Sequence, residues 1–281
     1  MKTSKLFLNA LMLLTAASLT LTSCKKEEED SDTSAASDNA LAESTFQDAT
    51  NIADEAGSGS LNNYRLGEDE GSLLSTCATV TRDSANHSDP DTITVDFGAT
   101  NCMCADGRNR RGKIIITYTG TYRSPGSSWT IGFDNYFVND NQVTGTKTVT
   151  NNGPNTAGHL VYAINVNGSI ILANNGGTIS WTSTRQREWT AGESTPQWND
   201  DMYSITGSAN GTNANGNTFT VQITSPLIRN MALGCRRHFV QGTFELTPQN
   251  KPTRTVDFGS GACDDLATVT INNNTYTIHL R

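Results

Sequence analysis

Residues 267–280 have the sequence ATVTINNNTYTIHL, which predicts a β-hairpin. Two runs rich in β-branched residues, 267–271 and 275–280, flank three consecutive asparagines. β-branched side chains fit the pleated surface of a sheet, and asparagine favours tight turns. This stretch is therefore expected to form two antiparallel strands joined by a short turn.

The same pattern of strands and turns extends back along the chain to about Leu73. The run KIIITYTG at 113–120 is β-branched and unbroken, and Asn167-Gly168 separates two apolar runs within 160–173, which is a strong hairpin signal. Strand-like runs recur about every 10–15 residues without a helical segment between them. This spacing excludes βαβ units and predicts an all-β fold, a single large antiparallel meander arranged as a curved sheet, a sandwich or a barrel-like sheet. Further turns are predicted at Asp106-Gly107, Asn175-Gly176-Gly177 and Asn215-Gly216.

One short helix is predicted over residues 39–56, before the β-rich part. Its apolar residues recur at helical spacing: Phe46, Ala49, Ile52, Ala53 and Ala56. Ser37 or Asp38 is the expected N-cap, and the Gly-Ser run at 57–60 is expected to end the helix. Because the apolar stripe is narrow, the helix is expected to pack on one edge or end of the sheet. The expected domain boundaries are a helix and linker at 39–60 and an antiparallel β domain at 61–281.

The pentapeptide TVDFG occurs twice, at 94–98 and at 255–259. Each copy is followed by one cysteine, four positions after its glycine, and preceded by another; the pairs are Cys77 with Cys102 and Cys235 with Cys263. The chain therefore contains a repeated cysteine unit, at 77–120 and at 235–281.

The most economical disulfide pattern closes each unit on itself, as Cys77–Cys102 and Cys235–Cys263. Pairing between the units remains open, because four cysteines allow three connectivities. Each of these loops would contribute about 3–4 kcal/mol on the chain-entropy account of disulfides. Cys104 is left over, either as a spare cysteine in a loop, which we favour, or as a redox or metal-binding thiol.

The N-terminal residues resemble a bacterial lipoprotein signal peptide. Lys2 and Lys5 precede an apolar segment at 6–21, which is shorter than the roughly 20 residues that a membrane-spanning helix needs. The segment ends in Leu21-Thr22-Ser23-Cys24. The resemblance implies that 1–23 is a signal peptide and that Cys24 carries the lipid anchor, palmitate among its acyl chains.

An acidic, Ser-rich tether is expected at 24–38, where Lys25-Lys26 is followed by Glu27-Glu28-Glu29-Asp30. A lysine followed by acidic residues just after the lipidated cysteine resembles the surface-export signal of lipoproteins from the Bacteroidetes phylum. It implies an outer-membrane protein exposed on the cell surface. A generic acidic spacer is the alternative.

The charge of the chain argues against nucleic acid as a partner. The 281 residues include 20 basic and 28 acidic side chains, and without Lys2 and Lys5 the balance is 18 − 28 = −10. Nucleic-acid binding needs a net basic face that releases counterions.

Most of the chain after Cys24 resembles a family of outer-membrane lipoproteins of the Bacteroidetes to which no activity is assigned. The residues that carry the resemblance are VDFG at 95–98, DGRNRRGKI at 106–114, FDNYFVN at 133–139 and the closing TVDFG-x-x-x-C at 255–263. The resemblance implies a location and a β-rich fold, and nothing about activity.

Two clusters are candidate ligand sites. Arg108, Arg110 and Arg111 form a basic patch with Lys113, and Arg236-Arg237-His238 follows Cys235. If the two cysteine units lie side by side, these residues would form one cationic surface for an anionic polysaccharide or a lipid headgroup. The alternative is that these charges protect strand edges from aggregation.

Trp181, Trp189 and Trp198 form the second cluster. Exposed at a hairpin tip, Trp189 and Trp198 would stack on sugar rings, whereas buried tryptophans would be ordinary core residues.

No motif predicts a cofactor, a metal or catalysis. The Asp and Asn pairs do not match a calcium loop, the four histidines match no zinc spacing, and Gly-x-Ser-x-Gly is missing from the sequence. We therefore expect a non-catalytic, lipid-anchored envelope or surface protein that binds a ligand, such as a glycan, or another surface protein. The alternative is a periplasm-facing structural protein or lipid carrier, and a hydrolase is the third hypothesis.

Overall fold

The computed structural model describes residues 30–58, 77–83, 90–120, 123–195, 197 and 199–280. Cys24 and the predicted signal peptide lie outside the described residues, as do residues 24–29 of the predicted tether. The chain divides into Met1–Ser31 and one compact unit, Asp32–Arg281. Among the described residues, no helix combines the length and the apolar character that crossing a membrane requires.

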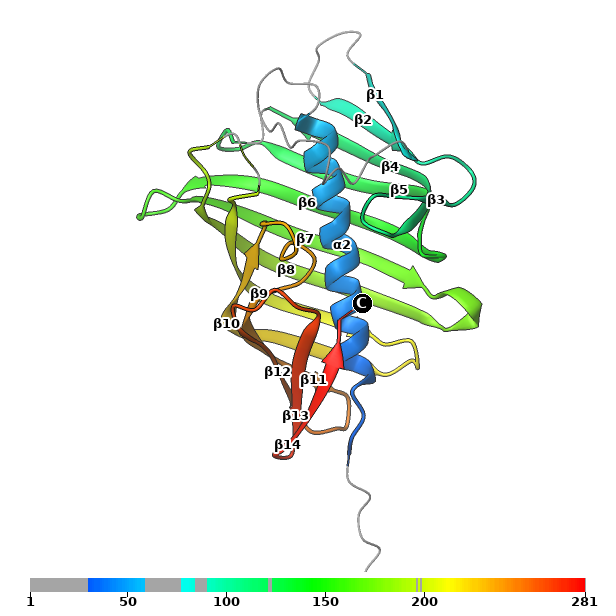
Figure 1. The fold of residues 1–281 in the computed structure, drawn as a ribbon, viewed down its shortest axis with the longest axis vertical. Coiled ribbons are helices and arrows are strands. Elements are labelled where there is room, and N and C mark those ends of the chain that lie inside the picture. The colour runs from blue at the N-terminus through cyan, green and yellow to red at the C-terminus, as the bar shows by residue number, and fades with distance from the viewer. Residues whose placement is uncertain are drawn as a thin grey trace, which may run out of the picture. The chain divides into compact units, whose positions relative to one another are not determined.

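Fourteen antiparallel strands of the described chain form one sheet (Figure 1). Each strand pairs with its neighbours in sequence, except that β3 pairs only with β4 at the side of the main path. The predicted all-β antiparallel meander is confirmed, and it takes the form of a curved sheet, with β1 and β14 at its two ends. The strands are β1 (Thr79–Asp83), β2 (Asp91–Asp96), β3 (Cys102–Met103), β4 (Asn109–Thr119), β5 (Ser128–Val138), β6 (Asn141–Pro154), β7 (Leu160–Ile171), β8 (Thr178–Ala191), β9 (Met202–Thr212), β10 (Thr218–Asn230), β11 (Gln241–Pro248), β12 (Arg254–Ser260), β13 (Leu266–Ile271) and β14 (Asn274–His279).

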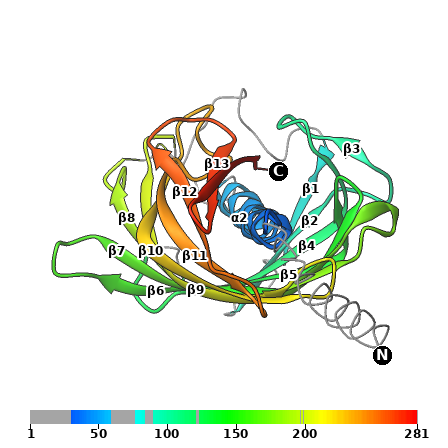
Figure 2. The same ribbon diagram turned by 90° about the horizontal axis from the view of Figure 1, so that it is seen from below.

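The sheet curves around the helix α2 (Ser34–Ser58), as the view along the helix shows (Figure 2). The strands alternate between buried and more exposed residues, and their buried side chains form one core with the helix. Phe46 of α2 lies at its centre, stacked on Trp181 with 5.7 Å between ring centroids and edge-on to Phe133 at 5.9 Å.

The position of α2 corrects two expectations. The helix packs along the concave face of the sheet, contacting β2, β4 and β5 as well as β7, β8 and β11, and not on an edge or end. Its row of alanines allows this close approach, so an apolar stripe that looked too narrow for a central position is sufficient. It also begins at Ser34, within the predicted tether. Ser34 N donates to Asp32 Oδ1 at 2.9 Å, whereas Asp38, one of the two expected caps, accepts from Ala214 N at 2.8 Å.

Most of the predicted turns are confirmed, and one is wrong. Four of them each connect two strands: the asparagines between β13 and β14, Asn175-Gly176-Gly177, Asp106-Gly107 and Asn215-Gly216. Asn175 is also the last residue of the short 3-10 helix Ala173–Asn175. Asn167-Gly168, in contrast, lies inside the continuous strand β7. Gly168 is needed there because a Cβ would lie 2.3 Å from Phe46 Cζ, so the glycine makes room for the helix instead of forming a turn.

The repeated cysteine unit is visible in the fold. The pairs Cys77–Cys102 and Cys235–Cys263 are bonded within their units, as the sequence favoured. The first TVDFG segment begins in β2 and continues past its end, and the second lies in β12. In both, the glycine N–H donates to the side chain of the aspartate two residues earlier at 2.8 Å. Cys104 is a free, buried cysteine. The two units therefore sit near opposite ends of the sheet with the same local turn.

Candidate functional site: an arginine cleft between the cysteine units

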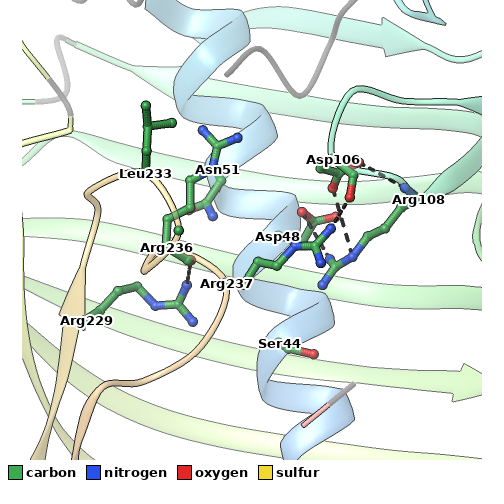
Figure 3. A pocket seen from close by; sticks show the side chains of 10 residues that line it. Ser44, Asp48, Asn51, Asp106, Arg108, Arg229, Leu233, Arg236 and Arg237 are labelled. Atoms are coloured by element: carbon green, nitrogen blue, oxygen red, sulfur yellow. Dashed lines mark hydrogen bonds and ion pairs between the residues drawn. The ribbon is translucent and has the colours of Figure 1, made fainter. Parts of the chain in front are cut away.

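A cleft with a volume of about 170 Å³ opens over α2, between the β3–β4 turn of the first cysteine unit and the β10–β11 loop of the second (Figure 3). We call it the arginine cleft, and its lining residues are Ser44, Asp48, Asn51, Asp106, Arg108, Arg229, Leu233, Gly234, Arg236 and Arg237. The curvature of the sheet brings the two units together here, although they are more than 100 residues apart in sequence.

Ion pairs fill the side of the cleft formed by the first unit. Arg110 Nη2 lies 2.7 Å from Asp48 Oδ2 and 2.7 Å from Asp106 Oδ2, and its Nη1 donates to Asp106 Oδ1 at 2.8 Å. Arg108 Nη1 lies 3.3 Å from Asp48 Oδ1. Burial alone would raise the pKa of Asp106, but hydrogen bonds from Arg110 and its charge hold that pKa below the ordinary value. Both carboxylates are therefore already engaged by arginines.

β10 and the β10–β11 loop contribute guanidinium groups on the other side, and Arg229 and Arg237 each donate to a carbonyl oxygen. Arg229, only 2% exposed, donates from Nη1 to the carbonyl oxygen of Arg236 at 2.6 Å and lies over the Phe239 ring at 5.0 Å. Its Nε is buried and has no hydrogen-bond partner among the described residues. Arg237 reaches across the cleft and donates to the carbonyl oxygen of Asp106, which links the two units.

Burial is the main cause of the pKa shifts near the cleft, and neighbouring arginines add to it. Burial lowers the pKa of Arg229 to about 10 against the attraction of Glu43, and the charge of Arg108 acts in the same direction as burial. Burial also lowers the pKa of His238, to about 4, with the charges of Arg229 and Arg108 adding to the effect. Four guanidinium groups and two carboxylates line the cleft, so its walls have a formal charge of 4 − 2 = +2.

The cationic cleft continues a trend of the whole concave face. Six basic side chains are buried in the described part of the chain, against two buried aspartates, Asp48 and Asp201. The helix supplies part of the compensation, because α2 contains five acidic residues and no basic one, and its Glu43 lies 2.7 Å from Arg185 Nη2. The buried bases are Arg110, Lys147, Arg185, Arg187, Arg229 and Arg254.

The structure brings together part of the predicted basic patch. Arg108 faces Arg236 and Arg237 in the arginine cleft, and Arg110 lies behind it in the buried ion pairs. Arg111 is the exception, because successive residues of a strand alternate between faces. It pairs with the exposed Asp140 and lies 3.8 Å from the centroid of Phe137, so Arg111 does not belong to this site.

The tryptophan platform is wrong for Trp189. Its side chain is 0% exposed, its Nε1 donates to Asp201 Oδ1 at 3.1 Å, and Arg123 covers the ring at 4.6 Å. Trp181 is also buried and donates to Asn39 Oδ1 at 2.9 Å. Trp189 is therefore a core residue that no sugar can reach, and Trp198 lies outside the described residues.

Sequence reasoning missed Asp48, Asp106 and Arg229 as cleft residues. Arg229 follows Leu227 at a strand spacing of two, on the face where apolar residues are expected, and a basic residue at such a position was an available signal. Asp48 and Arg110 are 62 residues apart in sequence, and no local sequence pattern predicts that they pair. Within the described ranges, no group of three or more His, Cys, Asp or Glu residues is placed to hold a metal ion.

Comparisons with protein-family models, with curated proteins and with solved structures gave no match.

Proposed function

We propose that this protein is an exported, lipid-anchored binding protein that takes a negatively charged ligand in the arginine cleft and catalyses no reaction on it. The observation that carries the proposal is the charge of the cleft, +2 on its walls, with both carboxylates already paired to Arg108 and Arg110. Arg229 and Arg237 remain without an ionic partner in the described structure, so an anion is the ligand that complements the site.

A non-catalytic role agrees with the chemistry of the lining. Asp48 and Asp106 hold arginines, and the lowered pKa of Asp106 keeps it ionised, which suits a structural ion pair better than a general acid. Ser44, the hydroxyl of the lining, donates from Oγ to the Leu41 carbonyl oxygen at 3.1 Å. A broad esterase and glycosidase screen tests this part of the proposal, and any turnover abolished by a change in the cleft would contradict it.

The geometry favours ligand binding in the cleft over a lipid carrier. A carrier needs an apolar cavity, and α2 occupies the concave face. The cavity bounded by Phe239, Phe244 and Phe258 has a volume of only about 20 Å³, against about 170 Å³ for the arginine cleft. Because Trp189 is buried, it cannot stack on a neutral sugar. The glycans that remain candidates are therefore the anionic ones, which the arginine cleft could bind.

Binding is tested with the full-length protein in detergent, by the shift in thermal unfolding that each ligand causes at constant ionic strength. The panel contains citrate, galacturonate and glucose 6-phosphate, with glucose as the neutral control. Because a ligand that binds only the folded state raises the unfolding temperature, we expect at least one anion to exceed glucose and sodium chloride. The shift should shrink in an Arg236→Gln/Arg237→Gln double variant. An identical response to every compound would reject the proposal.

The location is a separate part of the proposal, supported by the lipobox-like Leu21-Thr22-Ser23-Cys24 and the acidic run after it. Labelled palmitate should enter the wild-type protein and not Cys24→Ala. Protease added to intact producing cells should then remove the domain. If the domain is protected until the outer membrane is opened, it lies in the periplasm. That result would contradict surface exposure but not the lipid anchor at Cys24.

A further inference from the structure

We infer that the arginine cleft binds a single compact oxyanion, a phosphate- or sulfate-type group with two negative charges, and not a stretch of polyanion. This inference rests on the proposed function and narrows its ligand class. The same oxyanion chemistry is offered by a free anion, a sugar phosphate and a lipid headgroup.

The size of the cleft fits one such group. A cavity of roughly 150 Å³ can hold a ligand the size of benzene, so the volume of about 170 Å³ in the cleft accommodates one small group. That is enough for a tetrahedral oxyanion and the first atoms of the group that carries it. Leu233 stands among the lining residues and is 59% exposed, so it offers apolar contact to the uncharged remainder of a ligand.

The charge of the cleft fits a dianion. Arg108 shares Asp48 and Asp106 with the buried Arg110, whereas Arg229 and Arg237 bond to carbonyl oxygens and form no ion pair within the described residues. Two guanidinium groups without a counter-charge match two negative charges. A simple carboxylate would neutralise only one of them.

The lining of the cleft fits an acceptor-rich group. Arg229, Arg236 and Arg237 line it on one side of α2, and Arg108 lines it on the other (Figure 3). A tetrahedral oxyanion has acceptor atoms pointing in several directions, so it suits a site lined by several guanidinium groups.

The rest of the molecule argues against a long polyanion. The 281-residue chain has a formal charge of −8, whereas the walls of the cleft have a formal charge of +2. A long polyanion would extend beyond this cationic volume into the field of a net negative protein, and like charges placed together oppose binding. A compact anion fits within the cleft.

The experiment is isothermal titration calorimetry of the full-length protein in detergent, at pH 7.5 and constant ionic strength. Inorganic phosphate, glucose 6-phosphate and soluble dihexanoyl phosphatidate represent the three sources of the oxyanion, and polygalacturonate is the carboxylate polyanion. Arg237→Gln removes an exposed guanidinium of the cleft, and Arg229→Lys keeps the charge but removes the guanidinium group. Arg111→Gln is the control, since it makes the same charge change on the other face of β4.

We expect at least one phosphate compound to bind with 1:1 stoichiometry. Affinity should fall about tenfold or more in Arg237→Gln and in Arg229→Lys, because each loses a charged hydrogen bond, and should stay within about twofold in Arg111→Gln. Which phosphate compound binds most tightly identifies the source. An equal loss in Arg111→Gln would mean non-specific attraction and would overturn the inference.

The failures of the two proposals are distinguishable. If polygalacturonate binds and weakens in Arg237→Gln while no phosphate compound binds, the compact-oxyanion inference is wrong and the anion-binding function stands. If no anion binds the wild-type protein, both are wrong. Circular dichroism melting of each variant shows that a loss of affinity is not a loss of folding.

Discussion

Two adjacent arginines show how strongly a residue's role depends on the face it occupies. Arg110 is 0% exposed and holds the carboxylates of Asp48 and Asp106, whereas Arg111 pairs with the exposed Asp140. Arg110→Met would leave Asp48 and Asp106 without their main partner, and breaking a buried pair in this way costs about 3–5 kcal/mol. We expect that loss in the free energy of unfolding measured with urea.

Arg111→Met is the matched control, since exposed pairs contribute about 0–1 kcal/mol. Similar losses in the two variants would mean that the Arg110 pairs do not carry the stability that their burial implies.

Lys147 makes stability depend on pH in an unusual window. Its Nζ donates to the Phe46 carbonyl oxygen at 3.1 Å, and burial, followed by the charge of Arg187, lowers its pKa to about 7. Between that value and the ordinary lysine pKa of about 10.5, the unfolded chain holds a proton that the folded protein does not. The free energy of unfolding therefore rises with pH across this window, by at most about 1.4 kcal/mol per pH unit.

Urea unfolding at pH 7, 8 and 9 tests this, with Lys147→Met as the comparison. The difference between the two proteins isolates Lys147 from other titrating groups, such as Cys104, whose pKa burial raises. Parallel pH profiles would show that Lys147 stays protonated in the folded state.

Part of the site was predictable at this scale. Arg108, Arg236 and Arg237 were recognised because clustered bases near paired cysteines stand out in an acidic chain. Arg229 and Asp48 were not, because their role comes from contacts between distant parts of the chain. Trp189 was misassigned, since an indole beside polar residues in sequence has the same local pattern whether it is exposed or buried.

Among the secondary-structure elements, the fit between α2 and the sheet is controlled by the glycine of β7. A Cβ on Gly168 would lie 2.3 Å from Phe46 Cζ and 2.6 Å from the Thr144 carbonyl oxygen. Gly168→Ala should therefore destabilise the protein by about 1–3 kcal/mol through overpacking. Gly132→Ala is the control, because its Cβ would meet nothing closer than the Ile115 carbonyl oxygen at 4.0 Å.

Chemical denaturation of both variants measures the difference. Gly132→Ala should be neutral or stabilising by up to about 1 kcal/mol, since alanine restricts the unfolded chain. Equal stability of the two variants would contradict a tight contact between α2 and β7.

The elements themselves were mostly predictable from local pattern, and their packing was not. Strand runs and asparagine turns gave the meander, because the hairpins are local. Asn167-Gly168 failed as a turn because Phe46, 122 residues earlier, needs the space that glycine leaves. The predicted position of the helix was wrong for a similar reason. A row of alanines indicates that a helix packs closely, but it does not indicate on which surface the helix packs.

At the scale of the whole molecule, the sheet curves around α2, and its two end strands do not pair with each other in the described structure. β1 and β14 are the two ends of the sheet, and α2 contacts strands near one end, such as β2 and β4, and also β11 near the other. The two disulfides lie in the two cysteine units, toward opposite ends of this arrangement. The arginine cleft depends on all three parts, because its walls come from both units and its floor from α2.

This arrangement predicts that the two ends of the sheet unfold together. Removing Cys235–Cys263 by a double substitution to alanine should cost about 3–4 kcal/mol on the chain-entropy account, and removing Cys77–Cys102 should cost nearly the same, because the bonded residues are 28 and 25 apart. Since α2 belongs to one core with both ends, each loss should lower the stability of the whole domain. Far-UV circular dichroism and tryptophan fluorescence should then report one coincident transition in urea for the wild type and for both variants. Two separate transitions, with one end melting first when its own disulfide is removed, would show that α2 does not couple the cysteine units.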